Sequence, residues 1–198
     1  MSSPYKTFSC FTFGCKVNFA DSSMIARQLV DFGCSQIHDD INADICIINT
    51  CSVTDLADRK AQKLIKKINH NSPKAKIIVT GCYAQLKPEE ISNIKGVDFV
   101  IGADEKLDIN NYLFEDNNSA KIKANKIENV NNFKSSYSLN ERTRAFLKIQ
   151  DGCSYNCTYC TIPMARGISR SGTIKETIDS VKKIIATDVK EIVLSGIN

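Results

Sequence analysis

Three cysteines lie within eight residues in the segment QDGCSYNCTYCTIPMARG, at positions 150–167. They are Cys153, Cys157 and Cys160, spaced C-x3-C-x2-C, and the loop holds no histidine and no fourth cysteine. A structural zinc site needs four nitrogen or sulfur ligands, so three thiolates would leave it open. A [4Fe-4S] cluster bound by three cysteines has one iron without a protein ligand, free to bind a substrate or cofactor. The spacing favours such an open cluster over zinc.

Three further cysteines each follow a strand-like segment, in FTFGC, INTC and VTGC. Cys15, Cys51 and Cys82 are 36 and 31 residues apart, and each interval is about one βαβ unit of roughly 30 residues. Parallel strands end at a common carboxyl edge, where α/β proteins bind ligands. We therefore predict a second three-cysteine [4Fe-4S] cluster. Zinc, with His38 or His70 as a fourth ligand, is the alternative, although neither histidine is predicted at that edge.

The remaining cysteines are Cys10 and Cys46, inside predicted strands, and Cys34, after a predicted helix. We expect all three to be ordinary buried residues. Nine cysteines is an odd number in a chain too long to need disulfide staples, so metal or redox chemistry is the better interpretation.

The elements that must position these cysteines alternate along the first 114 residues. Apolar runs predict strands and amphipathic spacing predicts helices; the strands span 6–14, 43–51, 75–82 and 97–103, and the helices 19–33, 54–73, 87–96 and, weakly, 106–114. The pattern predicts an α/β fold with a doubly wound parallel sheet.

The composition changes to Asn, Ser and Lys between 115 and 141, which predicts a linker with a short β excursion. Residues 142–198 then predict a strand over 144–153, the cysteine loop, a helix over 175–188 and a strand over 190–198. We therefore divide the chain into domains 1–114 and 142–198, joined by the linker.

The net charge of +4 arises entirely after residue 114, because the first 114 residues hold 13 basic and 13 acidic side chains. Basic residues flank the cysteine loop, with Asp151 the one acid among them: Arg142, Arg144, Lys148, Arg166 and Arg170. They suggest a site for an anionic ligand or nucleic acid, and a solvated basic face is the alternative. The sequence has neither a signal peptide pattern nor an apolar run of about 18 residues, which predicts a cytoplasmic protein without a membrane segment.

The cysteine loop resembles the signature of the radical S-adenosylmethionine superfamily. The resemblance implies that Cys153, Cys157 and Cys160 bind a cluster that cleaves S-adenosylmethionine to a radical, and that Tyr159 packs near its adenine. It also implies that Ser195 and Gly196, in LSGIN, contact the amino group of S-adenosylmethionine. An ordinary turn after the strand is the alternative for these two residues.

Four blocks together resemble the methylthiotransferase family: TFGCKVNFADS, NTCSVTDLAD, TGCYAQ and LKIQDGCSYNCTYCTIPMARGISRS. The resemblance implies an auxiliary [4Fe-4S] cluster on Cys15, Cys51 and Cys82, followed by the start of a radical S-adenosylmethionine partial (β/α) barrel. It implies transfer of a methylthio group to C2 of N6-threonylcarbamoyladenosine at position 37 of tRNA. The alternatives are methylthiolation of isopentenyladenosine, a ferredoxin-like electron carrier, and a non-catalytic iron–sulfur or zinc-binding module.

The same resemblance implies tRNA as substrate, a flavodoxin or ferredoxin as electron donor, and a separate sulfur donor. Lys16, Asn18 and Gln85 are candidates for positioning sulfur or tRNA, with capping and loop hydrogen bonds as the simpler roles. Family members are considerably longer, so we expect this chain to be a fragment lacking the C-terminal part and to be inactive alone.

Overall fold

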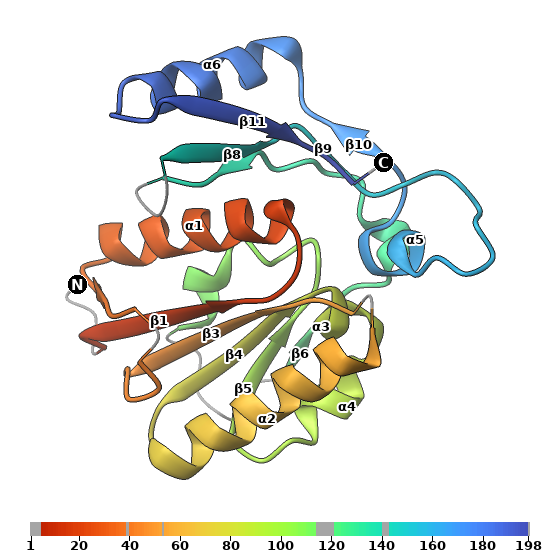
Figure 1. Ribbon diagram of the computed structural model, residues 1–198. Coiled ribbons are helices and arrows are strands. Elements are labelled where there is room, and N and C mark those ends of the chain that lie inside the picture. The colour runs from red at the N-terminus through yellow and green to blue at the C-terminus, as the bar shows by residue number, and fades with distance from the viewer. Residues whose placement is uncertain (1–4, 39, 53, 114–120, 140–142, 198) are drawn as a thin grey trace.

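The computed structural model describes residues 5–38, 40–52, 54–113, 121–139 and 143–197. Its larger sheet is entirely parallel, with the strand order β2-β1-β3-β4-β5-β6 (Figure 1). The strands are β1 (Thr7–Thr12), β2 (Ser35–Gln36), β3 (Ile45–Thr50), β4 (Lys76–Gly81), β5 (Val97–Ile101) and β6 (Ile122–Lys123).

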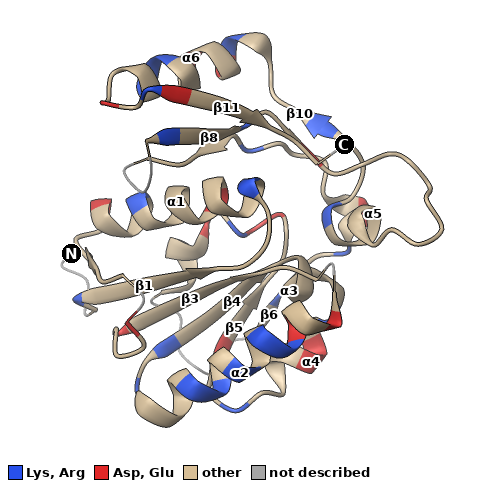
Figure 2. Cartoon of the chain, viewed as in Figure 1, with Lys and Arg blue, Asp and Glu red and all other residues tan. Residues whose placement is uncertain are grey.

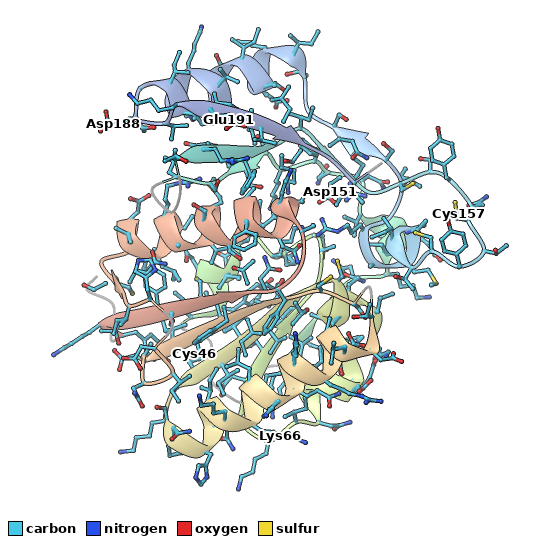
Figure 3. All side chains as sticks on the ribbon, in the orientation of Figure 1. Cys46, Lys66, Asp151, Cys157, Asp188 and Glu191 are labelled. Atoms are coloured by element: carbon cyan, nitrogen blue, oxygen red, sulfur yellow. The ribbon has the colours of Figure 1, made fainter. Side chains whose placement is uncertain are left out.

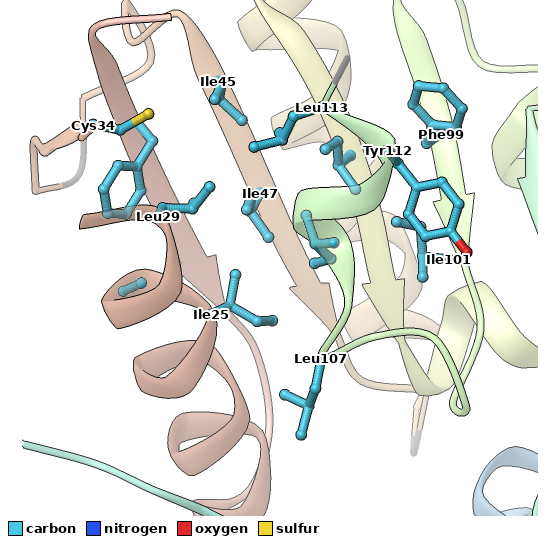
Figure 4. Close-up of a cluster of buried hydrophobic side chains, with 14 residues drawn as sticks. Ile25, Leu29, Cys34, Ile45, Ile47, Phe99, Ile101, Leu107, Tyr112 and Leu113 are labelled. Carbon is cyan, nitrogen blue, oxygen red and sulfur yellow. The ribbon is translucent and has the colours of Figure 1, made fainter. Parts of the chain in front are cut away.

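Helices cover both faces of this sheet. One face packs against α1 (Lys16–Asp31) and the 3-10 helix η1 (Ile109–Tyr112) through a cluster that includes Ile25, Leu29 and Ile47 (Figure 4). The other face packs against α2 (Asp55–Asn71), α3 (Cys82–Leu86) and α4 (Pro88–Ser92). Strands β3 and β4 are buried along their whole length, which explains why their sequences are continuous apolar runs. The predicted α/β fold with a doubly wound parallel sheet is confirmed.

A smaller sheet of three strands has the order β11-β8-β7. Strands β8 (Arg144–Lys148) and β11 (Glu191–Ser195) are parallel and are connected through α6 (Ile174–Ile185), whereas β7 (Ser136–Tyr137) is antiparallel to β8. Between β8 and α6 the chain forms β9 (Gln150–Asp151), the cysteine loop, α5 (Ile162–Arg166) and β10 (Arg170–Ser171). This is a single βαβ unit, so the start of a barrel stays a prediction.

Helix α1 lies between the two sheets and packs against β7 and β8 as well as β1 (Figure 1). The described part of 115–141 contributes to both sheets, because β6 extends the larger one and β7 the smaller one, with the short 3-10 helix η2 (Ile127–Asn129) between them. The domain boundaries stay predictions, and residues 114–120 and 140–142 lie outside the described residues.

Local capping explains where the helices begin. Cys15 is the N-cap of α1, so this helix begins at Lys16, three residues before the predicted start. Thr54 caps α2 by accepting a hydrogen bond from the Ala57 N–H at 3.3 Å, as its position before the amphipathic run predicts. The five-residue helix α5 was not predicted, because so short a segment carries no periodicity.

Candidate functional site

Cys15, Cys51 and Cys82 lie at the carboxyl edge of three adjacent strands. Cys51 directly follows β3 and Cys82 directly follows β4, whose last residues are paired in register, and Cys15 comes three residues after β1. The strand order changes direction between β1 and β3, and α1 and α2 leave this point toward opposite faces. Such a switch point is where doubly wound sheets bind ligands. The fold therefore gathers at one edge the three cysteines that the sequence separates.

Gly14 allows the loops after β1 and β3 to approach each other closely. Its φ is +99°, and a Cβ at this position would lie 2.7 Å from the Cβ and 2.9 Å from the Sγ of Cys51. The side chain of Asn18 fastens the same two loops, because its Nδ2 donates to the carbonyls of Phe13 at 2.7 Å and Thr50 at 3.0 Å. Asn18 therefore has the loop-fastening role expected of it as the simpler alternative.

Cys153, Cys157 and Cys160 occupy a loop at the surface, between β9 and α5. Figure 3 shows Cys157 on the part of this loop that projects from the body of the molecule. Cys157 is exposed, and the other two are half-buried. Within the part of the chain that the structure describes, no group of three His, Cys, Asp or Glu side chains is arranged to hold a metal ion. Both cysteine trios therefore stay predictions as ligand sets.

An open pocket of about 550 Å³ lies beside Cys15, between the start of α1 and the smaller sheet. Residues 14–17 and Phe19 line one side, and Phe146 and residues 194–196 line the other. The ammonium group of Lys16 lies 5.7 Å from the centre of the Phe146 ring, within the range of a cation–π contact across the pocket. The pocket thus brings a predicted auxiliary ligand, Cys15, together with Ser195 and Gly196, which were predicted to contact S-adenosylmethionine.

The three residues predicted to contact S-adenosylmethionine differ in exposure. Ser195 is buried, Gly196 is exposed, and Tyr159 is 89% exposed on the cysteine loop. Gln150, which the sequence analysis did not single out, fixes the segment after β11 by accepting a hydrogen bond from the Ile197 N–H at 2.6 Å. Its amide nitrogen also donates to the Gly152 carbonyl at the start of the cysteine loop. Gln150 therefore ties Gly196 to that loop.

Five buried charged side chains join α1 and the segment before η1 to the smaller sheet and α5. The carboxylate of Asp21 forms ion pairs with Lys106 at 2.6 Å and Lys148 at 2.7 Å. The carboxylate of Asp151 pairs with Arg166 at 2.7 Å, Lys106 at 3.5 Å and Lys148 at 3.7 Å. We call these residues the buried charge network: Asp21, Lys106, Lys148, Asp151 and Arg166.

The network fixes the charge state of its members. Burial alone would raise the pKa of Asp21, but the two lysines outweigh burial and lower it to about 2. The pKa of Asp151 is lowered as well, because Lys106 and Arg166 outweigh its burial. Both carboxylates are therefore ionised at neutral pH.

The network corrects the interpretation of the basic residues as a surface for an anion or nucleic acid. Lys148 and Arg166 are buried and paired with carboxylates, and Arg144 pairs with Glu191 at 3.6 Å. Arg170 donates to the carbonyls of Arg166 and Ile168, and Arg142 lies outside the described residues. Figure 2 shows instead that basic residues gather along α2, whose exposed basic side chains are Arg59, Lys60, Lys63, Lys66 and Lys67.

The three remaining cysteines differ in burial. Cys34 and Cys46 are buried in the two cores, and Cys10 is half-buried against one of them. Burial raises the pKa of the Cys46 thiol to about 12, so this sulfur is not a thiolate at neutral pH.

His38 and His70 are exposed, as their default interpretation predicts. Gln85 has a loop-fastening role, because it donates to the Asn125 carbonyl at 3.0 Å and accepts from the Ala103 N–H at 2.8 Å. In the part of the chain that the structure describes, no helix is both long and apolar enough to cross a membrane.

Comparison with known proteins gives these sites a family context. Residues 7–102 match the model described as "Uncharacterized protein family UPF0004". The chain is 38% identical over 194 residues to a threonylcarbamoyladenosine tRNA methylthiotransferase of Thermotoga maritima, which covers 98% of this chain and 44% of the relative. It is 36% identical over 197 residues to the enzyme of the same name from Bacillus subtilis, which covers 97% of this chain and 44% of the relative.

A tRNA-2-methylthio-N(6)-dimethylallyladenosine synthase of Protochlamydia amoebophila is 33% identical over 199 residues, covering 98% of this chain and 44% of the relative. The chain thus spans less than half the length of these curated relatives. The matched segment contains β1 to β5 and the cysteines that follow β1, β3 and β4. Residues 7–102 therefore match the UPF0004 family, and nearly the whole chain is similar to tRNA methylthiotransferases.

Proposed function

We propose that this chain belongs to a radical S-adenosylmethionine enzyme that transfers a methylthio group to C2 of N6-threonylcarbamoyladenosine at position 37 of tRNA. The observation that carries the proposal is the pocket at the start of α1, which Cys15 and residues 194–196 line together. Sulfur insertion at an aromatic carbon needs a sulfur source and a radical source within reach of one substrate atom. The names of the relatives supply the substrate class.

The type and the spacing of the cysteines are what support two three-cysteine clusters. Cys15, Cys51 and Cys82 would hold the auxiliary cluster, and the Gly14 cradle leaves room for the Cys51 sulfur. Cys153, Cys157 and Cys160 would hold the second cluster, on a loop that Gln150 anchors. When bound, such clusters supply the electron that cleaves S-adenosylmethionine and the sulfur that is transferred. Tyr159, Ser195 and Gly196 are the proposed contacts of S-adenosylmethionine.

Cofactor content separates this proposal from the zinc-binding alternative. After anaerobic reconstitution the chain should carry about eight iron atoms, from two clusters of four irons each. Replacing Cys153, Cys157 and Cys160 together by alanine should leave about half of the iron, whereas replacing Cys10, Cys34 and Cys46 should leave all of it. Zinc without iron, or equal losses in the two triple variants, would contradict the assignment. An EPR spectrum of the reduced chain that changes on addition of S-adenosylmethionine would exclude a simple electron carrier.

The substrate is tested in cells. Deleting the gene whose full product contains this chain should remove the methylthio group from threonylcarbamoyladenosine in the tRNA of the host, as measured by mass spectrometry of digested nucleosides. Restoring the gene with Cys15→Ala should not return the modification, whereas restoring it with Cys34→Ala should. Loss of methylthiolated isopentenyladenosine instead would support the second candidate, which the similarity to dimethylallyladenosine synthases favours. We propose a cytoplasmic protein served by a flavodoxin or ferredoxin and by a sulfur donor.

A further inference from the structure

Arg166 is a buried cation between the two cysteine-bearing regions. It is the last residue of α5, the helix that follows the Cys153–Cys160 loop, and only 3% of it is exposed. Helix α5 packs against α3, whose first residue is Cys82. The guanidinium donates from Nη1 to Asp151 at 2.7 Å and from Nη2 to the Oδ1 of Asn18. Arg166 therefore contacts the residue that fastens the loops leading to Cys15 and Cys51.

The buried charge network leaves one positive charge uncompensated. It contains three cations and two carboxylates, all buried. An uncompensated buried charge is costly, so such charges are normally paired. Asp151 pairs directly with Arg166 at 2.7 Å. Arg166 also lies on the helix that packs against α3, whose first residue is Cys82. The element that carries Arg166 is therefore next to the sheet-edge cysteines.

One donor of Arg166 has no partner. Its Nε is buried and, among the described residues, makes no hydrogen bond, although both Nη atoms do. A buried N–H without an acceptor costs about 1–3 kcal/mol, so native proteins rarely leave one unsatisfied. Arg166 therefore lacks an acceptor for Nε–H, and the network to which it belongs lacks one negative charge.

We propose that Arg166 is part of the site formed by Cys15, Cys51 and Cys82, where its guanidinium supplies positive charge and the Nε–H donor to the anionic sulfur group held there. The proposal rests on the proposed function, in that this group is an iron–sulfur cluster. Hydrogen bonds and charge near cluster sulfurs set the reduction potential. Because a cation favours the more negative, reduced state, Arg166 raises the potential of the auxiliary cluster.

A purely structural role is the competing explanation, since Arg166 also joins α5 to α1. The two roles differ in what they change: a structural contact alters stability, whereas a charge beside the cluster alters its potential in a protein that remains folded. The test therefore measures potential and folding separately. All variants are made in the Cys153→Ala, Cys157→Ala, Cys160→Ala background, which keeps the auxiliary cysteines and removes the ligands proposed for the second cluster.

The variants separate the effect of the charge of Arg166 from the effect of losing a charge elsewhere in the chain. Arg166→Gln removes the charge, Arg166→Lys keeps it but loses the planar fork, and Arg144→Gln removes an equal charge from an exposed pair with Glu191. Midpoint potentials are measured by EPR-monitored redox titration, and iron content and circular dichroism are recorded in parallel. We expect Arg166→Gln to shift the potential to more negative values. Arg166→Lys, which keeps the charge, should show only a small part of that shift, and Arg144→Gln should leave the potential unchanged.

Two outcomes would overturn the proposal. Equal potentials in Arg166→Gln and Arg144→Gln would show that Arg166 is only a structural contact. Should Arg166→Gln not fold, Arg166→Lys decides: the loss of the Nε–H donor should still produce a small negative shift, and an unchanged potential would refute the assignment. A background variant that binds no iron would instead contradict the proposed function, so the two failures are distinguishable.

Discussion

At the scale of single residues, the cysteines of the sheet edge depend on neighbours that carry no chemistry. Gly14 has a positive φ and faces the side chain of Cys51, and Asn18 binds the carbonyl of the residue before each of them. The cysteines are visible in the sequence because their type and spacing are informative. Their neighbours become significant only once the loops after β1 and β3 lie together.

Gly14→Ala is expected to damage the auxiliary site, because the new Cβ would overlap the Cys51 side chain. Gly33→Ala is the matched control: Gly33 has φ +89°, but a Cβ there meets no atom within 4 Å. Both changes place alanine in the left-handed region, at a cost of about 1–2 kcal/mol. Chemical denaturation should therefore show similar losses from the backbone, with an additional loss in Gly14→Ala.

Iron content separates the two glycine variants further. Gly14→Ala should retain about half of the iron of the unaltered chain, since four of about eight irons belong to the auxiliary site. Gly33→Ala should retain all of it. Full iron in Gly14→Ala would show that Cys51 does not need its present position.

At the scale of elements, α1 connects the larger sheet to the smaller one. Its apolar residues pack on the larger sheet, while Asp21 accepts hydrogen bonds from Ser136 at 2.6 Å and Lys148 at 2.7 Å in the smaller sheet. The strands of the larger sheet were predictable because strands buried on both faces read as apolar runs. The role of Asp21 was not, because its partners are 115 and 127 residues away. For the same reason Lys148 and Arg166 suggested a basic surface when they are buried ion pairs.

Acid should reduce the stability that the ion pairs of Asp21 give to the fold. The pKa of Asp21 is lowered to about 2 in the folded chain, from a usual 3.8, so its ion pairs stabilise the fold fully above about pH 4. That contribution is lost as the pH falls from about 4 to about 2, and Asp151, whose pKa is also lowered, adds to the loss. Urea unfolding midpoints measured at pH 7, 4, 3 and 2 should decline mainly across this window.

Asp21→Asn isolates the contribution of this residue. The variant leaves Lys106 and Lys148 with one carboxylate between them, and breaking such a buried pair costs about 3–5 kcal/mol at neutral pH. Its stability should then change less than that of the unaltered chain between pH 4 and pH 2. An equally steep decline in the variant would assign the acid sensitivity to other carboxylates.

At the scale of the whole molecule, the smaller sheet offers surfaces on which further elements could pack. Strand β11 pairs only with β8 among the described strands. Helix α6 exposes apolar side chains, with Ile174 81% and Ile185 64% exposed. The resemblance to the methylthiotransferase family agrees with the names of the relatives, but one βαβ unit cannot by itself show a barrel.

The last prediction is that this 198-residue chain binds iron but does not methylthiolate tRNA through repeated turnovers. Reaction requires the substrate carbon, the sulfur and S-adenosylmethionine in close alignment, and an error of about 1 Å can cost about 10²-fold in rate. Tyr159, the proposed adenine contact, is 89% exposed, and the pocket beside Cys15 is open to solvent. The surroundings of Tyr159 and the pocket beside Cys15 are therefore too open to hold the reactants in that alignment.

The assay incubates the reduced, reconstituted chain with S-adenosylmethionine and tRNA bearing threonylcarbamoyladenosine, followed by digestion and mass spectrometry of the nucleosides. The Thermotoga maritima relative, more than twice as long as the segment it shares with this chain, serves as the positive control under identical conditions. More than one product per chain would contradict the prediction and would mean that the elements of this chain suffice to align the reactants. Product from the relative alone would indicate that the alignment depends on parts of the longer protein that this chain does not share.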